Sequence, residues 1–162
     1  TGVTTGSIYH RFSSRDELLA RLWLRSIRRF QAGLLELAAR EDAGPALVDS
    51  AVYVVSYCRE NREEALAMTL WRQPALARTG PEGVRQEALH VNDTYDAVIR
   101  ELVARRYGRV TPHRMELVVA ACQAVPYGLV RPHLAEGTPI PDWLDDVVRA
   151  AAGATLDLGD GE

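Results

Sequence analysis

The chain has 162 residues, of which 47% are hydrophobic and 25% charged, and it is long enough to bury the core of one globular domain. Its longest uncharged apolar run, residues 117–130, is too short to cross a membrane and is interrupted by Pro126 and Gly128; no signal-peptide pattern is present, so we expect a cytoplasmic protein with no membrane partner. The net charge of −3 hides a basic N-terminal end, because residues 1–31 carry six arginines and only two acids. This asymmetry is compatible with nucleic acid binding at that end, and equally with a solvated helix face.

The first segment, TGVTTGSIYHRF, combines turn residues with about two turns of predicted helix over residues 4–11. Thr4 can cap this helix, and Ile8 and Phe12 lie four positions apart on an inward face, where we expect them to belong to the core. Small residues at the start of a helix allow close approach to a duplex, where backbone N–H groups and hydroxyls can bind phosphates or base edges. The outward-facing residues are Thr5, Gly6, Ser7, Tyr9, His10 and Arg11.

A long helix is predicted over residues 14–40. Ser14 and Glu17 have the spacing of a capping box, and apolar residues recur every three or four positions from Leu19 to Leu37. A second long helix is predicted from Pro45, which suits a first helical turn, to about Glu60.

Four further helices are predicted, so the chain as a whole is expected to be all-α. They cover residues 62–71, ended by Pro74 and the linker ARTGPEG, then 81–107, ended by Gly108, then 112–134 and 142–156. Pro126 predicts a kink in the 112–134 helix, because proline cannot donate a backbone hydrogen bond to the Cys122 carbonyl. Residues 158–162 form an acidic tail that we expect to be disordered.

The stretch GVTTGSIYHRFSSRDELL closely resembles the recognition helix and the following long helix of the TetR family of transcriptional regulators. The resemblance covers residues 2–19, and the other residues are similar to the family in the number, length and order of their helices. It implies a partial helix-turn-helix head, residues 1–13, a connecting helix, residues 14–40, and an α-helical ligand-binding and dimerisation domain, residues 41–157, before the tail.

The same resemblance implies which residues meet operator DNA. Arg15 takes the place of a lysine that contacts a phosphate in the family, and Gly6 allows close approach. It also implies that one helix and most of a second would precede Thr1, so we expect the chain as given to bind DNA more weakly than a longer form. The implied DNA-binding residues are Thr4, Thr5, Gly6, Ser7, Tyr9, His10 and Arg15.

In a regulator of this kind, a small apolar or aromatic effector would occupy a pocket among the central helices and release a repressor from its operator. Glu87 interrupts the apolar stripe of the predicted 81–107 helix, so it is expected either to pair with an arginine or to await a polar or cationic ligand. The other candidates fit a core or rim position as well as a ligand contact. The candidate ligand-binding residues are Tyr57, Trp71, Glu87, Tyr95, Gln123 and Tyr127.

The last two predicted helices, 112–134 and 142–156, are the expected dimer surface. Paired with their symmetry mates they would form a four-helix bundle, which explains why the first of them is apolar on several sides. A homodimer is therefore expected.

The sequence is also compatible with two functions other than that of a regulator. Glu87 and His90 form the Glu-x-x-His step that supplies metal ligands in di-iron helical bundles, so a helical-bundle enzyme or metal protein is the alternative; a second step and further glutamates would be needed. A helical interaction module without DNA or ligand is the third reading. The four histidines lie far from one another and from Cys58 and Cys122, which gives no catalytic arrangement or zinc knuckle, so we expect no enzyme activity, no metal and no cofactor.

Overall fold

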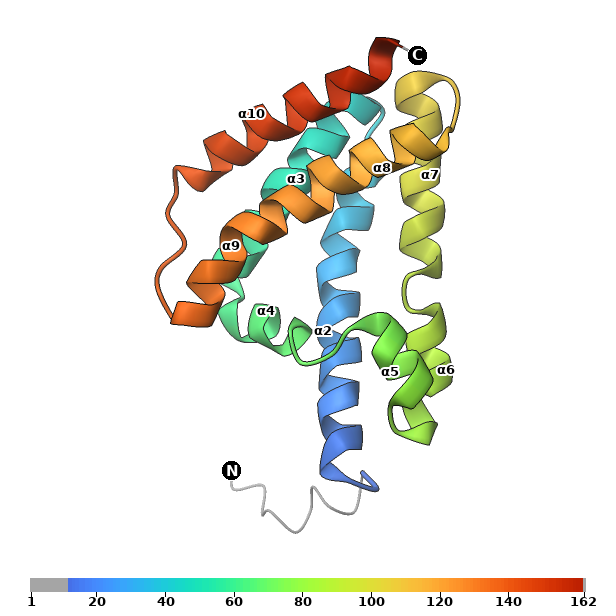
Figure 1. Cartoon of the computed structure of the whole chain (residues 1–162), viewed down its shortest axis with the longest axis vertical. Coiled ribbons are helices and arrows are strands. Elements are labelled where there is room, and N and C mark those ends of the chain that lie inside the picture. The colour runs from blue at the N-terminus through green and yellow to red at the C-terminus, as the bar shows by residue number, and fades with distance from the viewer. Residues whose placement is uncertain (1–11, 162) are drawn as a thin grey trace.

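The computed structural model describes residues 12–161, and within that range the chain contains helices and no strands, which confirms the predicted all-α class. Figure 1 shows α2, Arg15–Ala38, running along the long axis of the molecule, with α5 and α6 against its first half and α10 at the opposite end. None of the helices in this range is long and apolar enough to cross a membrane. The other elements are α3 (Ala43–Glu60), α4 (Arg62–Met68), α5 (Gln73–Thr79), α6 (Glu82–His90), α7 (Asp93–Tyr107), α8 (Pro112–Val119), η1 (Ala120–Ala124), α9 (Val125–Glu136), α10 (Leu144–Asp157) and η2 (Leu158–Gly161).

The start of α2 follows the predicted capping chemistry with one difference. Ser14 caps the helix, and its side chain accepts a hydrogen bond from the Glu17 backbone at 3.1 Å. The Glu17 carboxylate reaches back to Ser13 instead of Ser14, and it accepts from the Ser13 backbone N–H at 2.9 Å. The first turn is therefore closed one residue earlier than a capping box would close it.

Two hydrophobic cores lie at different heights along α2. The first half of α2 packs its buried Trp23 and Leu24 against α5 and α6, where Leu76 and Val84 are fully buried. The larger core is formed mainly by α3, α7, α8, η1, α9 and α10, with Ala65 of α4 and with Ala38 from the end of α2. One helix thus connects two separately packed ends of the molecule.

The predicted 81–107 helix is wrong in one respect, because it is two helices, α6 and α7, separated at Val91 and Asn92. The Asn92 side chain accepts a hydrogen bond from Gln31 on α2 at 2.9 Å. Because α6 packs in the small core and α7 in the large one, the break allows the two helices to take different directions, each packed against its own core. Continuous periodicity along the sequence hides this change of partner.

The linker predicted after Pro74 is also wrong, because residues 73–79 form α5. Pro74 lies in the first turn of this helix, where its missing N–H costs nothing, rather than ending the helix before it. Leu76 on α5 is fully buried and supplies part of the small core.

The irregularity predicted at Pro126 takes the form of a π-helical turn, η1, between α8 and α9. The Val125 backbone N–H donates to the Ala120 carbonyl, five residues back, just before the proline that cannot donate. The turn lies in the large core, where the Cys122 thiol donates to the Leu47 carbonyl at 3.3 Å.

The tail is ordered over residues 158–161, contrary to the predicted disorder. Gly159 is buried in the η2 turn, and its carbonyl accepts a hydrogen bond from the Arg114 side chain at 3.0 Å. Asp160 pairs with Arg106 on α7 at 2.8 Å. These contacts fasten the tail to the end of α7 and the start of α8.

Candidate functional site

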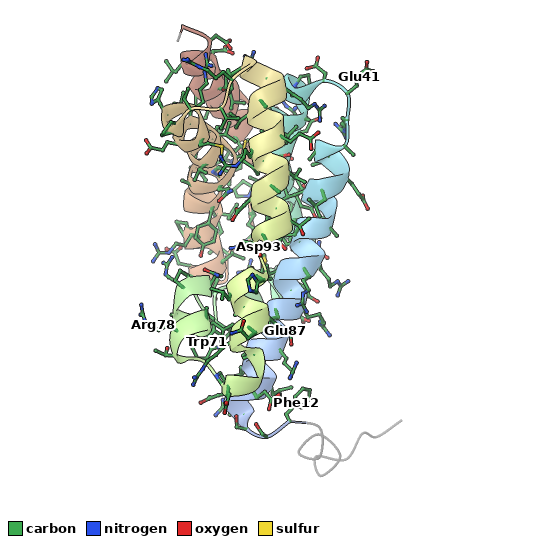
Figure 2. All side chains as sticks on the ribbon, turned by 90° about the vertical axis from the view of Figure 1, so that its right-hand side faces the viewer. Phe12, Glu41, Trp71, Arg78, Glu87 and Asp93 are labelled. Atoms are coloured by element: carbon green, nitrogen blue, oxygen red, sulfur yellow. The ribbon has the colours of Figure 1, made fainter. Side chains whose placement is uncertain are left out.

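The predicted DNA-reading residues fall at one end of the chain and are only partly described. Thr4, Thr5, Gly6, Ser7, Tyr9 and His10 lie outside the described residues, as does Ile8. Arg15, the first residue of α2, is exposed, and Phe12 just before it is half-buried. Figure 2 shows Phe12 at the end of the molecule furthest from Glu41.

On one side, α2 is tied to α4 by a carboxylate that three side chains share. Glu64 on α4 accepts hydrogen bonds from Arg29 at 2.7 Å, from Arg25 at 3.0 Å and from the hydroxyl of Ser26, a fully buried residue. The Ser26 hydrogen bond, followed by Arg25 and Arg29, lowers the pKa of Glu64 against the opposing effect of burial.

On its other side, α2 is tied to α6 by Glu87. The Glu87 carboxylate accepts from Arg28 at 2.9 Å and from Arg21 at 3.3 Å, so of the two roles predicted for it the arginine pair is the one that forms. Arg21 also binds Glu17 at 2.8 Å. Hydrogen bonds from the side chain and backbone of Ser13, and then from Arg21, lower the pKa of Glu17 to about 2.

These arginines line a cavity that we call the arginine groove. It has a volume of about 360 Å³ and runs along one face of α2, with Glu87 of α6 as its wall. Figure 2 shows Glu87 between Phe12 and Asp93 along the long axis, in the same half of the molecule as the start of α2. The lining residues are Arg21, Leu24, Arg25, Arg28, Arg29, Ala32 and Glu87.

The structure does not bring the six candidate ligand-binding residues into one site. Tyr95 and Gln123 are in contact, with the Gln123 amide donating to the Tyr95 hydroxyl at 2.9 Å, and burial raises the pKa of Tyr95. Trp71 packs against the small core, Glu87 faces α2, and Tyr127 is exposed on α9.

Tyr57 lies in an aromatic cluster between α2 and α3. Its ring packs edge-on against Phe30, with 5.2 Å between ring centroids, and Phe30 stacks on Tyr53 at 5.6 Å. The Tyr57 hydroxyl is buried and has no hydrogen-bond partner among residues 12–161. A buried hydroxyl normally has a partner, so this atom is suited to hydrogen-bond a small molecule or a water.

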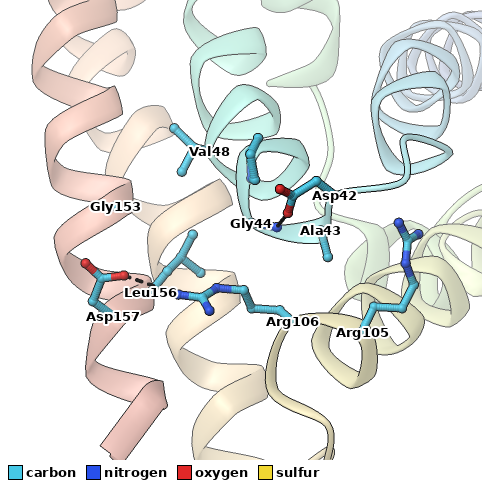
Figure 3. Close-up of a pocket in the computed structure, with 10 residues that line it drawn as sticks. Asp42, Ala43, Gly44, Val48, Arg105, Arg106, Gly153, Leu156 and Asp157 are labelled. Carbon is cyan, nitrogen blue, oxygen red and sulfur yellow. Dashed lines mark hydrogen bonds and ion pairs between the residues drawn. The ribbon is translucent and has the colours of Figure 1, made fainter.

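A second cavity, of about 370 Å³, lies beside the start of α3 and is walled by α7 and α10. Figure 3 shows Arg106 pointing to Asp157, which it binds at 3.2 Å, while Arg105 points away from it. Arg105 donates instead to the Ala38 carbonyl at 3.1 Å and the Glu41 carbonyl at 2.7 Å. Both guanidinium groups are occupied in holding helices together.

The Glu87 and His90 step does not assemble a metal site in the described part of the chain. Glu87 binds arginines, whereas the His90 ring nitrogen Nδ1 lies 2.7 Å from the Asp93 carboxylate. Among residues 12–161, no three His, Cys, Asp or Glu side chains gather as metal ligands would. Cys58 and Cys122 are both buried and unpaired with each other, and burial raises the pKa of each thiol.

The arginine groove was not foreseen from the sequence as a site. The sequence shows its arginines only as part of the basic N-terminal end, and no pattern in the sequence predicts a role for Glu64. Comparison of the chain with models of protein families, with curated proteins and with solved structures found no match.

Proposed function

We propose that this chain is a TetR-like transcriptional regulator, acting as a repressor in the cytoplasm, whose dimer binds operator DNA and is released by a small-molecule effector. The observation that carries the proposal is the sequence GVTTGSIYHRFSSRDELL, in which small and polar residues that suit a recognition helix precede a capped long helix. Arg15, which belongs to this stretch, is exposed on the first turn of α2, and an exposed guanidinium there is available for a phosphate.

The dimer is supported by exposed apolar stripes on the last two long helical segments. On α8, η1 and α9, residues at helical spacing are exposed and apolar or small: Val119, Ala124, Tyr127 and Gly128. A second stripe follows the exposed face of α10: Trp143, Val147, Ala150, Ala154 and Leu158, with Trp143 61% and Leu158 67% exposed. Burying both stripes against a second copy gives the proposed four-helix interface.

The effector part of the proposal is supported by the aromatic cluster between α2 and α3. The Tyr57 hydroxyl, which has no hydrogen-bond partner among residues 12–161, belongs to a ring that packs against Phe30 and Tyr53, so the cluster offers an available polar atom beside aromatic surface. A ligand bound there would touch α2, the helix that leads from the DNA-reading segment into the bundle.

The test is selection of duplexes from a random DNA pool by the natural protein, with any residues that precede Thr1. We expect enrichment of one sequence with two half-sites, separated so that two recognition helices meet the major groove about 34–36 Å apart. In a separate measurement, the 162-residue chain should have a mass in solution of twice 17.9 kDa. A pool that stays random would refute the DNA-binding proposal, and a monomeric mass would refute the dimer.

A further inference from the structure

We propose that the arginine groove on α2 binds a small organic carboxylate with an apolar body. The proposal concerns ligand binding by this chain alone, so it can fail or succeed independently of DNA binding. It rests on the charge, the free donors and the floor of the groove.

Positive charge is in excess in the groove. The four guanidinium groups of Arg21, Arg25, Arg28 and Arg29 face three carboxylates, those of Glu17, Glu64 and Glu87. Each arginine binds at least one of these carboxylates, yet the seven groups together carry a net charge of +1. An anion in the groove would meet that excess at short range, where screening by salt is least effective.

Hydrogen-bond donors also remain available. Arg25, Arg28 and Arg29 each make one hydrogen bond within residues 12–161, through a single nitrogen. A guanidinium carries several N–H donors in a planar fork that matches a carboxylate. Arg25 and Arg28 lie three positions apart on α2, which places them as neighbours on one helix face.

The floor of the groove is apolar. Leu24 lies beneath the groove and is only 2% exposed, so the accessible aliphatic surface comes from Ala32 and from the stems of the arginines. The volume of about 360 Å³ is in the range of small-molecule sites. A bare inorganic anion would leave this floor uncovered, whereas a carboxylate with a hydrocarbon tail would cover it.

The acids around the groove favour a small anion over a polyanion. Glu64 lies on one side of the α2 arginines and Glu87 on the other, so an extended phosphate backbone would meet a carboxylate on either flank. A compact carboxylate can instead bind between them, and it competes with Glu87 for Arg28.

The experiment is calorimetric titration of the purified protein with octanoate, with neutral octanamide as the matched ligand and inorganic phosphate as the bare anion. We expect octanoate to bind with a dissociation constant on the order of 0.1 mM, and octanamide and phosphate to bind at least about tenfold more weakly. The double variant Arg25→Gln, Arg28→Gln should lose octanoate affinity at least about tenfold. Arg78 is an exposed arginine on α5 that Figure 2 shows pointing away from the bundle. The variant Arg78→Gln removes the same charge outside the groove, so it is the matched control and should leave the octanoate affinity unchanged.

A variant that binds octanoate more tightly would show that the groove itself holds the ligand, because unfolding or a general loss of positive charge can only weaken binding. Glu87→Gln removes the competing carboxylate and should tighten octanoate binding several-fold, with circular dichroism confirming that each variant is folded. Absence of saturable octanoate binding would overturn the proposal. So would equal affinity for octanamide, unchanged affinity in the double variant, or weaker binding by Glu87→Gln.

Discussion

Glu64→Gln tests whether the shared carboxylate stabilises the packing of α4 on α2. The glutamine keeps the shape of the side chain and can still accept from Ser26, but it removes the charge. A hydrogen bond to a charged group contributes about 1.5–3 kcal/mol and a neutral one about 1 kcal/mol, so the loss at the buried Ser26 hydroxyl is about 1 kcal/mol. Arg25 and Arg29, 63% and 59% exposed at the side chain, add only about 0.5 kcal/mol between them. The expected fall in the free energy of unfolding is about 1.5 kcal/mol.

The assay is urea unfolding followed by circular dichroism at fixed protein concentration and pH 7. With a urea dependence of about 2 kcal/mol per molar, the unfolding midpoint should fall by roughly 0.7 M. Glu63→Gln is the matched control, because Glu63 is the exposed neighbour of Glu64 on α4 and makes no side-chain hydrogen bond or ion pair with residues 12–161. Ser26→Ala completes a double-mutant cycle and should make Glu64→Gln less costly. Equal unfolding midpoints for Glu64→Gln and Glu63→Gln would show that the Glu64 carboxylate does not stabilise the packing of α4 on α2. Additive effects in the cycle would show that Ser26 and Glu64 do not interact.

Three further predictions follow from close contacts and titrating groups. Gly33→Ala should destabilise the protein by about 1–2 kcal/mol in urea unfolding, because a Cβ there would overlap the Tyr53 hydroxyl. Gly153→Ala, whose Cβ would meet no atom of residues 12–161 within 4 Å, should be neutral or stabilising by up to about 1 kcal/mol. A stabilised Gly33→Ala would contradict the packing of Tyr53 against Gly33. The lowered pKa of Glu17, about 2, means that its contribution to stability is present above the unfolded value near 4.5 and is lost as pH falls towards 2. The urea midpoint of Glu17→Gln should therefore decline less than that of wild type between pH 5 and pH 2.5, and parallel curves would count against the Ser13 contacts. Burial raises the pKa of Cys122 to about 12, so a disulfide reagent at pH 8 should label this thiol only after unfolding; rapid labelling of the folded protein would show that the π-helical turn is open.

Much of the helical pattern could be predicted from the sequence, because it depends on local chemistry. The start of α2 at Ser14 and the end of α7 at Gly108, which has a left-handed φ of 72°, follow from the residues themselves. Pro74 could not be assigned in this way, since proline is compatible both with the end of one helix and with the first turn of the next. The break between α6 and α7 depends on which core each helix contacts, and that information is not local.

The arginine groove escaped prediction for a similar reason. Arg29 and Glu64 are 35 positions apart in the chain, and Arg21 and Glu87 are 66 apart. Only the packing of α4 and α6 on either side of α2 brings these charges together, and periodicity within one helix does not specify it. The candidate ligand-binding residues lie apart for the same reason, because the pattern within each helix does not specify which helix packs beside it.

Our proposal that the segment before α2 binds DNA can be tested by fluorescence anisotropy titration of the duplex selected from the random pool. Wild type, Tyr9→Ala, Arg15→Gln and Arg78→Gln would be compared at several salt concentrations. We expect Tyr9→Ala to bind the duplex at least about tenfold more weakly, Arg15→Gln to lower the salt slope by about one, and Arg78→Gln to behave as wild type. Equal affinity and equal salt slope for all four proteins would contradict it.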